Sequence, residues 1–389
     1  MSNVGYSSRM LSRLSVRNIY EFKDVFLFLN TPHPAFIYGK SSLIRSLSTT
    51  KDKCNSSVTR HYRFLTAVSG FPKSQPRLNT PLNIDQILKG QIGEDAYFIA
   101  SHSERDTQNL KSRSENKKQC VKHILKPSSS SENTAEDLDE KILFNNNHAD
   151  VIGVADGVGG WRQFGVDPSK FSQQLMQNCE QLITSGHFSS DRPIQLLANA
   201  YSEMKQSKKL AYGSSTACLA ILSNVDGKIS IANMGDSGLM VIRNGKLFNR
   251  TPEQVHCFNT PFQLSLPPPG HSDQGTLVDN PEDADAYEFN SQDGDVIILA
   301  TDGVFDNVPD SLLVEQVSSI NGETKDQAKV QQCCNSIAFM ARELSRDRDF
   351  LSPFAESARS HGYRNEIGGK EDDITVVMAV VSVETESNV

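Results

Sequence analysis

Short apolar runs that stop at a glycine or an acid recur along the middle and the end of the chain. The runs 151–155, 213–222 and 296–300 are mostly apolar and are bounded by Gly, Ser, Asp or Thr. Runs of this length with such boundaries are typical of buried strands. Asp226-Gly227 and Asn244-Gly245 lie between apolar runs and have the composition of tight hairpin turns. The pattern therefore predicts a meander of antiparallel strands.

Segments with an apolar residue every three or four positions alternate with these strands. The segment 168–186 places Phe171, Leu175 and Cys179 on one helical face. The predicted strands are 94–100, 151–155, 213–222, 228–233, 239–242, 296–300 and 374–383, and the predicted helices are 168–186, 193–210, 310–319 and 325–345. No element is assigned to 61–90, which contains three prolines, and 250–290 is expected to be irregular.

Composition separates a folded part from two other segments. Residues 1–60 carry Arg9, Arg13 and Arg17 at four-residue spacing, frequent serines and no acid before Glu21, which is typical of a mitochondrial transit peptide. A disordered basic tail is the alternative. Residues 102–147 are rich in Ser, Lys, Asn and Glu, and we interpret them as a disordered insertion between two paired strands. The folded domain is then expected to span 61–385.

The net charge of −8 is unevenly distributed. Residues 1–80 carry twelve Lys and Arg against three acids, so the remaining chain carries about −17. An acidic body argues against nucleic-acid binding, which needs a basic face. The seven cysteines form no Cys-x-x-Cys and indicate neither a disulfide framework nor a zinc site. No apolar run approaches the ~18 residues of a membrane span.

Acidic residues stand beside the ends of the predicted strands. They are Glu94, Asp95, Asp156, Asp302, Asp372 and Asp373, with Asp236 in a turn between two strands. Each alone is equally consistent with a solvated acid. If they converge, their mutual repulsion requires cations, and carboxylates together with a glycine carbonyl are hard oxygen ligands for Mg²⁺ or Mn²⁺. The set therefore predicts a hydrolase that uses metal-activated water.

Six motifs follow one another along residues 85–384. They are Gly-Glu-Asp-Ala (93–96), Val-Ala-Asp-Gly-Val-Gly-Gly-Trp (154–161), Gly-Ser-Ser-Thr-Ala (213–217), Asn-Met-Gly-Asp-Ser-Gly (233–238), Leu-Ala-Thr-Asp-Gly-Val-Phe-Asp-Asn (299–307) and Asp-Asp-Ile-Thr-Val-Val (372–377). In this order they resemble the metal-dependent serine/threonine protein phosphatases of type 2C (PPM-type). Together with Phe-Asn-Thr-Pro-Phe-Gln-Leu at 258–264, they resemble the mitochondrial PTC-seven-like branch. The resemblance implies an α+β fold, a four-layer α-β-β-α sandwich of two antiparallel sheets with metals in a cleft at one end.

The resemblance also implies a role for each acid by its position. Asp156 would bridge two Mn²⁺ or Mg²⁺ ions, and Gly157 would supply a carbonyl ligand. The other implied roles are further metal ligands for Asp95, Asp302 and Asp372, a weaker third metal position for Asp236 and Asp306, and the orientation of a metal-bound water for Glu94. Asp373 takes the place of an Asn in the family. The implied reaction is attack on phosphorus by a hydroxide that bridges the two ions, with Asp156, Asp302 and Glu94 as the catalytic residues.

Two departures from the family pattern affect the chemistry. Many relatives carry a His after the Asp-Gly as the proton donor to the leaving group, whereas this chain has Val158. The phosphate-binding Arg is also absent, with Gly90 near its place, and Lys89 or Arg162 is the expected substitute.

Two further residues have simpler expected roles. We expect Trp161, the only tryptophan, in the core rather than over the cleft. We expect His256 to be a plain loop residue rather than a substrate contact.

The leading functional hypothesis is an active phosphatase for phosphoserine and phosphothreonine, because every expected acid is present. A pseudophosphatase that acts as a binding module is the second hypothesis, and hydrolysis of a small phosphorylated metabolite is the third. Phosphorylated proteins are the expected partners, and the chain is expected to be a monomer. The arginine spacing and the family branch indicate the mitochondrial matrix, with the cytoplasm as the alternative.

Overall fold

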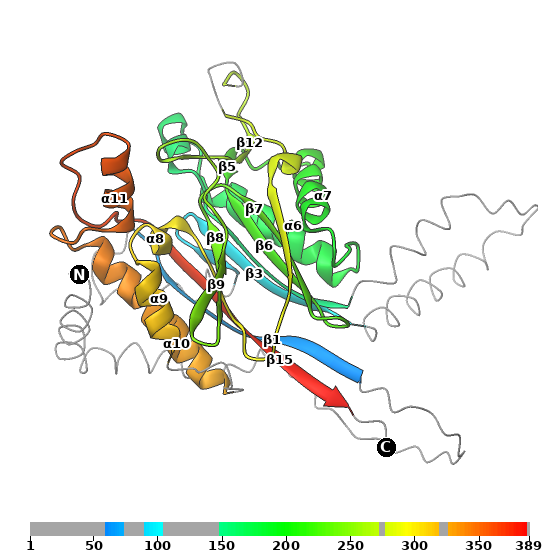
Figure 1. Ribbon diagram of the computed structural model, residues 1–389. Coiled ribbons are helices and arrows are strands. Elements are labelled where there is room, and N and C mark those ends of the chain that lie inside the picture. The colour runs from blue at the N-terminus through cyan, green and yellow to red at the C-terminus, as the bar shows by residue number, and fades with distance from the viewer. Residues whose placement is uncertain (1–58, 74–88, 104–147, 272–276, 319–325, 387–389) are drawn as a thin grey trace, which may run out of the picture. The chain divides into compact units, whose positions relative to one another are not determined.

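Two antiparallel sheets form the centre of the fold (Figure 1). The computed structural model describes residues 59–73, 89–103, 148–271, 277–318 and 326–386, all within one structural unit, Val58–Val389. One sheet has five strands in the order β1-β15-β14-β8-β9, and the other has six in the order β13-β7-β6-β4-β3-β2. Two small two-stranded pairs, β10-β11 and β12-β5, adjoin them in the chain.

The element bounds are as follows. The strands are β1 (Thr59–Phe71), β2 (Gln91–Ile92), β3 (Asp95–His102), β4 (Ala149–Ala155), β5 (Gly213–Ser215), β6 (Ala217–Ser223), β7 (Lys228–Met234), β8 (Gly238–Arg243), β9 (Lys246–Arg250), β10 (Val255–Cys257), β11 (Thr260–Pro261), β12 (Leu264–Leu266), β13 (Asp285–Asn290), β14 (Val296–Ala300) and β15 (Ile374–Glu386). The helices are η1 (Gly159–Phe164), α6 (Ser169–Thr184), α7 (Pro193–Gln206), η2 (Pro281–Asp283), α8 (Asp302–Phe305), α9 (Asp310–Val317), α10 (Gln327–Ser345) and α11 (Pro353–Ser360).

Strand β4 shows why these apolar runs form central strands. Its alternate residues point to opposite faces of the sheet. Ile152 and Val154 pack into a core between the two sheets, together with Leu299 and Val377 of the five-stranded sheet. Val151, one residue away, packs into a second core on the other face. A strand that is covered on both faces reads as a continuous apolar run, which is the pattern in the sequence.

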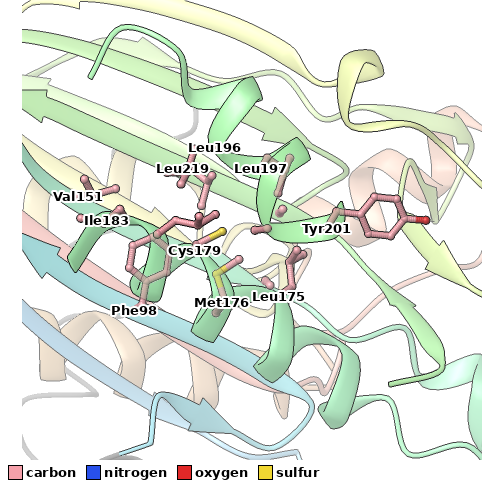
Figure 2. Close-up of a cluster of buried hydrophobic side chains, with 14 of the residues drawn as sticks. Phe98, Val151, Leu175, Met176, Cys179, Ile183, Leu196, Leu197, Tyr201 and Leu219 are labelled. Atoms are coloured by element: carbon pink, nitrogen blue, oxygen red, sulfur yellow. The ribbon is translucent and has the colours of Figure 1, made fainter. Parts of the chain in front are cut away.

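Helices cover the outer face of each sheet. Figure 2 shows side chains of α6 and α7, among them Leu175, Cys179 and Leu197, packed with Phe98 and Leu219 of the six-stranded sheet. On the other side, α10 packs against β1 and β15 (Figure 1). Burial of each large side chain contributes roughly 1.5–3 kcal/mol relative to its exposure. The layers are therefore helix, sheet, sheet, helix, which confirms the predicted α+β sandwich.

Several elements were not predicted, and β1, β13 and α11 are among the longest of them. β1 pairs with β15 along its whole length, from Thr59↔Glu386 to Phe71↔Ile374, although its sequence is half polar. β13 pairs with β7 inside the stretch expected to be irregular, and its residues alternate between half-buried and exposed. α11 begins at Pro353, and its N-cap Ser352 accepts a hydrogen bond at Oγ from Ala355 N–H. Long-range pairing or packing stabilises these segments, so local patterns indicate them only weakly.

The run 213–222 forms two strands instead of the one predicted. β5 pairs with β12, whereas β6 pairs with β4 and β7, and the break falls at Thr216. Thr216 is buried and bonds Asp156 twice, since its N–H donates to Asp156 O and its Oγ1 accepts from Asp156 N–H, both at 3.0 Å. The break therefore fixes the turn after β4.

Two predicted segments fall largely outside the described residues. The predicted transit segment 1–60 lies outside them up to residue 58, and the predicted insertion lies outside them from 104 to 147. The strands on either side of the insertion pair as expected, from Ala96↔Ala155 to His102↔Ala149. Among the helices that the structure describes, none has the length and hydropathy to cross a membrane.

Candidate metal centre

Strand register brings the predicted acids together. The pairing Ala96↔Ala155 places Asp95 and Asp156 at adjacent ends of β3 and β4. In the other sheet, Ala300 pairs with both Gly238 and Val376, so Asp302 follows β14 beside the start of β8 and the start of β15. The Thr301 hydroxyl donates to Asp95 Oδ2 at 2.8 Å and joins the two groups of strand ends. The convergence that the sequence analysis supposed is therefore present in the fold.

The acids raise one another's pKa values. Burial and then the charges of Asp95, Asp302, Asp372 and Asp236 raise the pKa of Asp156 well above its usual value. Burial likewise raises the pKa values of the neighbouring acids, and repulsion by Asp302 adds to that rise at Asp95, Asp236 and Asp372. Such a group of carboxylates is unfavourable at neutral pH unless cations compensate it.

Three carboxylate oxygens at this centre have no protein partner among the described residues. Asp95 Oδ1, Asp236 Oδ1 and Asp302 Oδ1 are buried and accept no hydrogen bond there. An unpaired buried acceptor costs roughly 1–3 kcal/mol, and more when it is charged. Hard, anionic oxygen donors of this kind suit Mg²⁺ or Mn²⁺. The residues present therefore fit the divalent ions that the family implies.

The carboxylates face one region without closing on a single point. Within the described part of the chain, no three His, Cys, Asp or Glu side chains stand in ready-made ligand geometry. Metal ligation would therefore require the acidic side chains to move closer together. This arrangement agrees with their mutual repulsion.

The turn after β4 requires glycine. A Cβ at Gly157 would lie 2.7 Å from Glu94 O and 2.8 Å from Pro168 O, closer than a side chain can approach. The backbone on either side is fixed, because Val158 N–H donates to Ser214 O at 3.0 Å and Thr216 N–H donates to Asp156 O. Gly157 therefore lets the backbone pass beside the acids at a fixed position.

Asp373 has a different task from Asp372. Its Oδ1 accepts from Lys73 N–H at 2.6 Å, and its Oδ2 accepts from Glu94 N–H at 2.7 Å. The buried Asp373 side chain thus ties the end of β1 and the Glu94 turn to the start of β15. Asp372 instead faces Lys73 and Lys370.

Lys370 is the site residue that the sequence analysis missed. Its Nζ lies 2.5 Å from Asp302 Oδ2, 2.7 Å from Asp306 Oδ2 and 3.5 Å from Asp372 Oδ2. Burial alone would lower the pKa of Lys370, but these three acids raise it well above its usual value. Burial raises the pKa of Asp306 to about 7, and Lys370 opposes that rise. The only sequence signal was its place two residues before Asp372, which does not distinguish it from a surface lysine.

The two predicted phosphate-binding residues have different surroundings. Arg162 lies in η1, directly after the Asp156 turn, and its Nε donates to Glu94 Oε1 at 2.7 Å. Burial raises the pKa of Glu94, and Arg162 partly opposes this. Lys89 is exposed on the turn before β2. Val158 is half-buried and has an apolar side chain, so it donates no proton.

The prediction for Trp161 is confirmed, whereas the prediction for His256 is wrong. Trp161 is 6% exposed, and its Nε1–H donates to Ser214 Oγ at 2.6 Å, so the predicted core position is confirmed. His256 is not a plain loop residue, because it lies in β10, its Nε2 is 3.0 Å from Asp279 Oδ2, and its ring stacks on Phe262. No local pattern indicates this pairing, since Asp279 lies 23 residues from His256 in the chain.

Known proteins are similar to this chain in sequence and in fold. Residues 151–382 match the family model described as Stage II sporulation protein E (SpoIIE). The chain is 45% identical over 238 residues to the protein phosphatase PTC7 homolog of Xenopus laevis, which covers 61% of this chain and 79% of that protein. It is 46% identical over 238 residues to the protein phosphatase PTC7 homolog of Homo sapiens, with 61% and 77% covered. The X-ray structure of the photosystem II phosphatase PBCP is similar with a TM-score of 0.56 at 26% identity, over 82% of this chain and 98% of that one.

The sandwich and these matches define a PPM-type phosphatase. Within that class, the chain belongs to the PTC7-like family.

Proposed function

We propose that this protein is a metal-dependent protein phosphatase that hydrolyses phosphoserine and phosphothreonine in other proteins. The observation that carries the proposal is the set of buried carboxylate oxygens at one centre, three of which have no partner in the described part of the chain. The relatives named as PTC7 protein phosphatases support the same activity. A pseudophosphatase would not need to preserve an acid cluster that destabilises the metal-free fold.

Each acid has a proposed task. Asp156 and the Gly157 carbonyl would hold two divalent ions, with Asp95, Asp302 and Asp372 as further ligands. The family pattern assigns Asp236 and Asp306 to a weaker third position, where Lys370 Nζ already contacts Asp306. When bound, Mn²⁺ or Mg²⁺ supplies an activated water and neutralises charge on the phosphoryl oxygens. Glu94 uses Oε1 for Arg162, while its Oε2 lies beside Gly159, where we place its contact with the attacking water.

We place the substrate phosphate beside Arg162 rather than Lys89. Arg162 is held next to the acid centre by Glu94, and its side chain is 61% exposed. A guanidinium has five N–H donors in a plane that matches phosphate oxygens, and the Glu94 bond uses one of them. Val158 offers no proton, so the leaving oxygen takes its proton from metal-bound water or another donor at the centre.

The experiment that tests the activity compares hydrolysis of a phosphoserine peptide by the full chain with and without Mn²⁺. Asp156→Asn and Asp302→Asn should each remove Mn²⁺-dependent turnover while circular dichroism shows an unchanged fold. Asp150→Asn is the matched control, since Asp150 is also a largely buried acid but bonds Phe64 N–H outside the centre. The proposal fails if the wild type shows no turnover with Mn²⁺, or if both site variants retain full activity.

A panel of phosphorylated metabolites, assayed beside the peptide, separates a protein phosphatase from a metabolite phosphatase. Faster turnover of a metabolite than of every phosphopeptide would favour the latter.

We also propose that the protein acts in the mitochondrial matrix as a monomer. The arginine spacing of residues 1–60 supports this location. A fusion of residues 1–60 to a fluorescent reporter should enter mitochondria, and a diffuse cytosolic signal would contradict the proposal. The molar mass of the purified chain in solution, measured by light scattering, tests whether it is a monomer.

A further inference from the structure

The Lys370 ammonium lies inside the acid centre, not at its edge. Its side chain is 18% exposed, and its Nζ contacts one oxygen each of Asp302, Asp306 and Asp372. Lys73 also contacts Asp372, at 3.4 Å, but its side chain is 48% exposed. The two lysines therefore form a natural comparison between an internal cation and a surface cation at the same cluster.

The backbone of Lys370 is fixed by a buried amide. Lys370 N–H donates to Asn307 Oδ1 at 2.8 Å, and Asn307 Nδ2 donates to Lys370 O at 2.9 Å. Asn307 Nδ2 also donates to Gly303 O at 2.9 Å, and the Asn307 side chain is fully buried. One amide thus ties the lysine to α8, which begins at Asp302 and is followed by Asp306.

Packing beside Lys370 restricts it further. A Cβ at Gly369 would lie 2.1 Å from Leu344 O, so the chain approaches Lys370 along a path that only glycine fits. The ammonium lies 5.2 Å from the centre of the Phe354 ring, a position that favours a cation. Lys370 is therefore preorganised among the acids and does not reach them as a mobile surface side chain.

Asp302 separates two parts of the centre. Its Oδ2 bonds Lys370, whereas its Oδ1 is buried without a partner in the described residues. Asp306 and Asp372 lie on the lysine side, where they contact Nζ directly. Asp156 has Asp95, Asp302 and Asp372 among its charged neighbours, and their charges raise the pKa of its carboxyl after the effect of burial. Lys370 therefore compensates Asp302 and Asp306 by direct contact, whereas Asp156 has no such contact with it among the ion pairs of the described residues.

We propose that Lys370 is a resident cation that takes the place of the weaker third ion beside Asp302 and Asp306, and so limits the centre to two metal ions. This inference rests on the proposed metal-dependent function. A third divalent ion beside Asp306 would meet the ammonium at close range, where like charges repel strongly in a buried site. Lys370 is thus a positioning residue that sets how many ions bind and where.

The test counts Mn²⁺ ions bound to the full chain at saturating Mn²⁺, by native mass spectrometry and by calorimetric titration. The wild type should bind two ions, and Lys370→Met should bind three. Lys370→Arg keeps the charge and should bind two. Lys73→Met removes the surface cation at the same cluster and should also bind two, which separates a specific place from a general change in charge.

The outcomes distinguish this inference from the function on which it rests. A wild type that binds two ions, beside a Lys370→Met variant that also binds two, would overturn the inference and leave the metal-dependent function intact. A wild type that binds three ions would overturn it even if Lys370→Met failed to fold. A wild type that binds no Mn²⁺ would overturn the proposed function as well.

Discussion

The Thr301 hydroxyl donates a 2.8 Å hydrogen bond to Asp95 Oδ2, across a separation of 206 residues in the chain. Thr301 is completely buried, and its Oγ1 also accepts from Thr375 N–H at 3.2 Å. The bond joins the end of β14 in the five-stranded sheet to the start of β3 in the six-stranded sheet. One hydroxyl thus orients a proposed metal ligand and links the two sheets at the acid centre.

The first prediction concerns this hydroxyl. Thr301→Val should weaken Mn²⁺ binding by about 10–100-fold, the usual effect of removing a residue that orients a metal ligand. Calorimetric titration with Mn²⁺ measures this, and Thr301→Ser, which keeps the hydroxyl, should bind nearly as the wild type does. Equal affinity for Thr301→Val and the wild type would show that the bond does not orient Asp95.

The second prediction concerns the stability of the metal-free protein against pH. The pKa of Asp306 rises from an ordinary 3.8 to about 7 in the fold, chiefly through burial. Below about pH 4 the carboxyl is protonated in both the folded and the unfolded states, so it does not affect stability. Between about pH 4 and 7 the unfolded state releases the proton while the folded state keeps it, so stability falls as pH rises.

Thermal denaturation in EDTA at pH 5, 6, 7 and 8 tests this, with Asp306→Asn as the comparison. The Tm of the variant should fall less steeply over this range than that of the wild type. Added Mn²⁺ should stabilise the wild type increasingly as pH rises, because metal ligands must be deprotonated. If Tm falls equally with pH in the wild type and in Asp306→Asn, the pH dependence of stability arises from groups other than Asp306.

The third prediction concerns the Glu94–Arg162 pair. Burial raises the pKa of Glu94, and Arg162 holds it lower than burial alone would. Arg162→Ala should therefore move the acidic limb of the pH profile of kcat/KM to higher pH, by about one unit or less because Arg162 is largely exposed. The same variant should raise KM for the phosphopeptide if Arg162 holds phosphate.

Lys89→Ala is the control for that measurement and should change neither quantity. If Glu94 assists proton transfer, Glu94→Gln should lower kcat by about 10²-fold or more. The same variant should flatten the acidic limb of the pH profile of kcat/KM. A Glu94→Gln enzyme with an unchanged acidic limb would contradict this assignment.

The fourth prediction concerns the bond between Trp161 and Ser214. Trp161→Phe removes the Nε1–H donor, which should destabilise the fold by about 1–3 kcal/mol. Urea denaturation followed by circular dichroism measures this, and the cycle with Ser214→Ala gives the coupling between the two side chains. A coupling energy near zero would mean that the Trp161–Ser214 hydrogen bond does not contribute to stability. The stabilising effect of Ser214 would then come from its other bond, which it donates to Gln263 Oε1.

The local pattern predicted the central strands and most helices, because the spacing of apolar residues indicates whether one or both faces of an element are buried. The helix predicted at 168–186 is α6, and the hairpin turn at Asn244-Gly245 joins β8 to β9 with positive φ at both residues. The same reading missed β1, because its half-polar sequence becomes a strand only by pairing with β15 more than 300 residues away. It missed α11 because this helix has only 8 residues, fewer than the roughly 11–18 over which a helical repeat can be recognised.

The sequence by itself determined which acids are present, in what order, and that they end or begin strands, since these are properties of neighbouring residues. Only the tertiary structure decided that Asp95, Asp156 and Asp302 meet, because register between strands of two different sheets brings them to one place. Only the tertiary structure placed Lys370 among them, because the sequence does not distinguish a lysine at the surface from one in a buried centre. Sequence patterns report which face of an element is buried, whereas only packing determines which buried charges become neighbours.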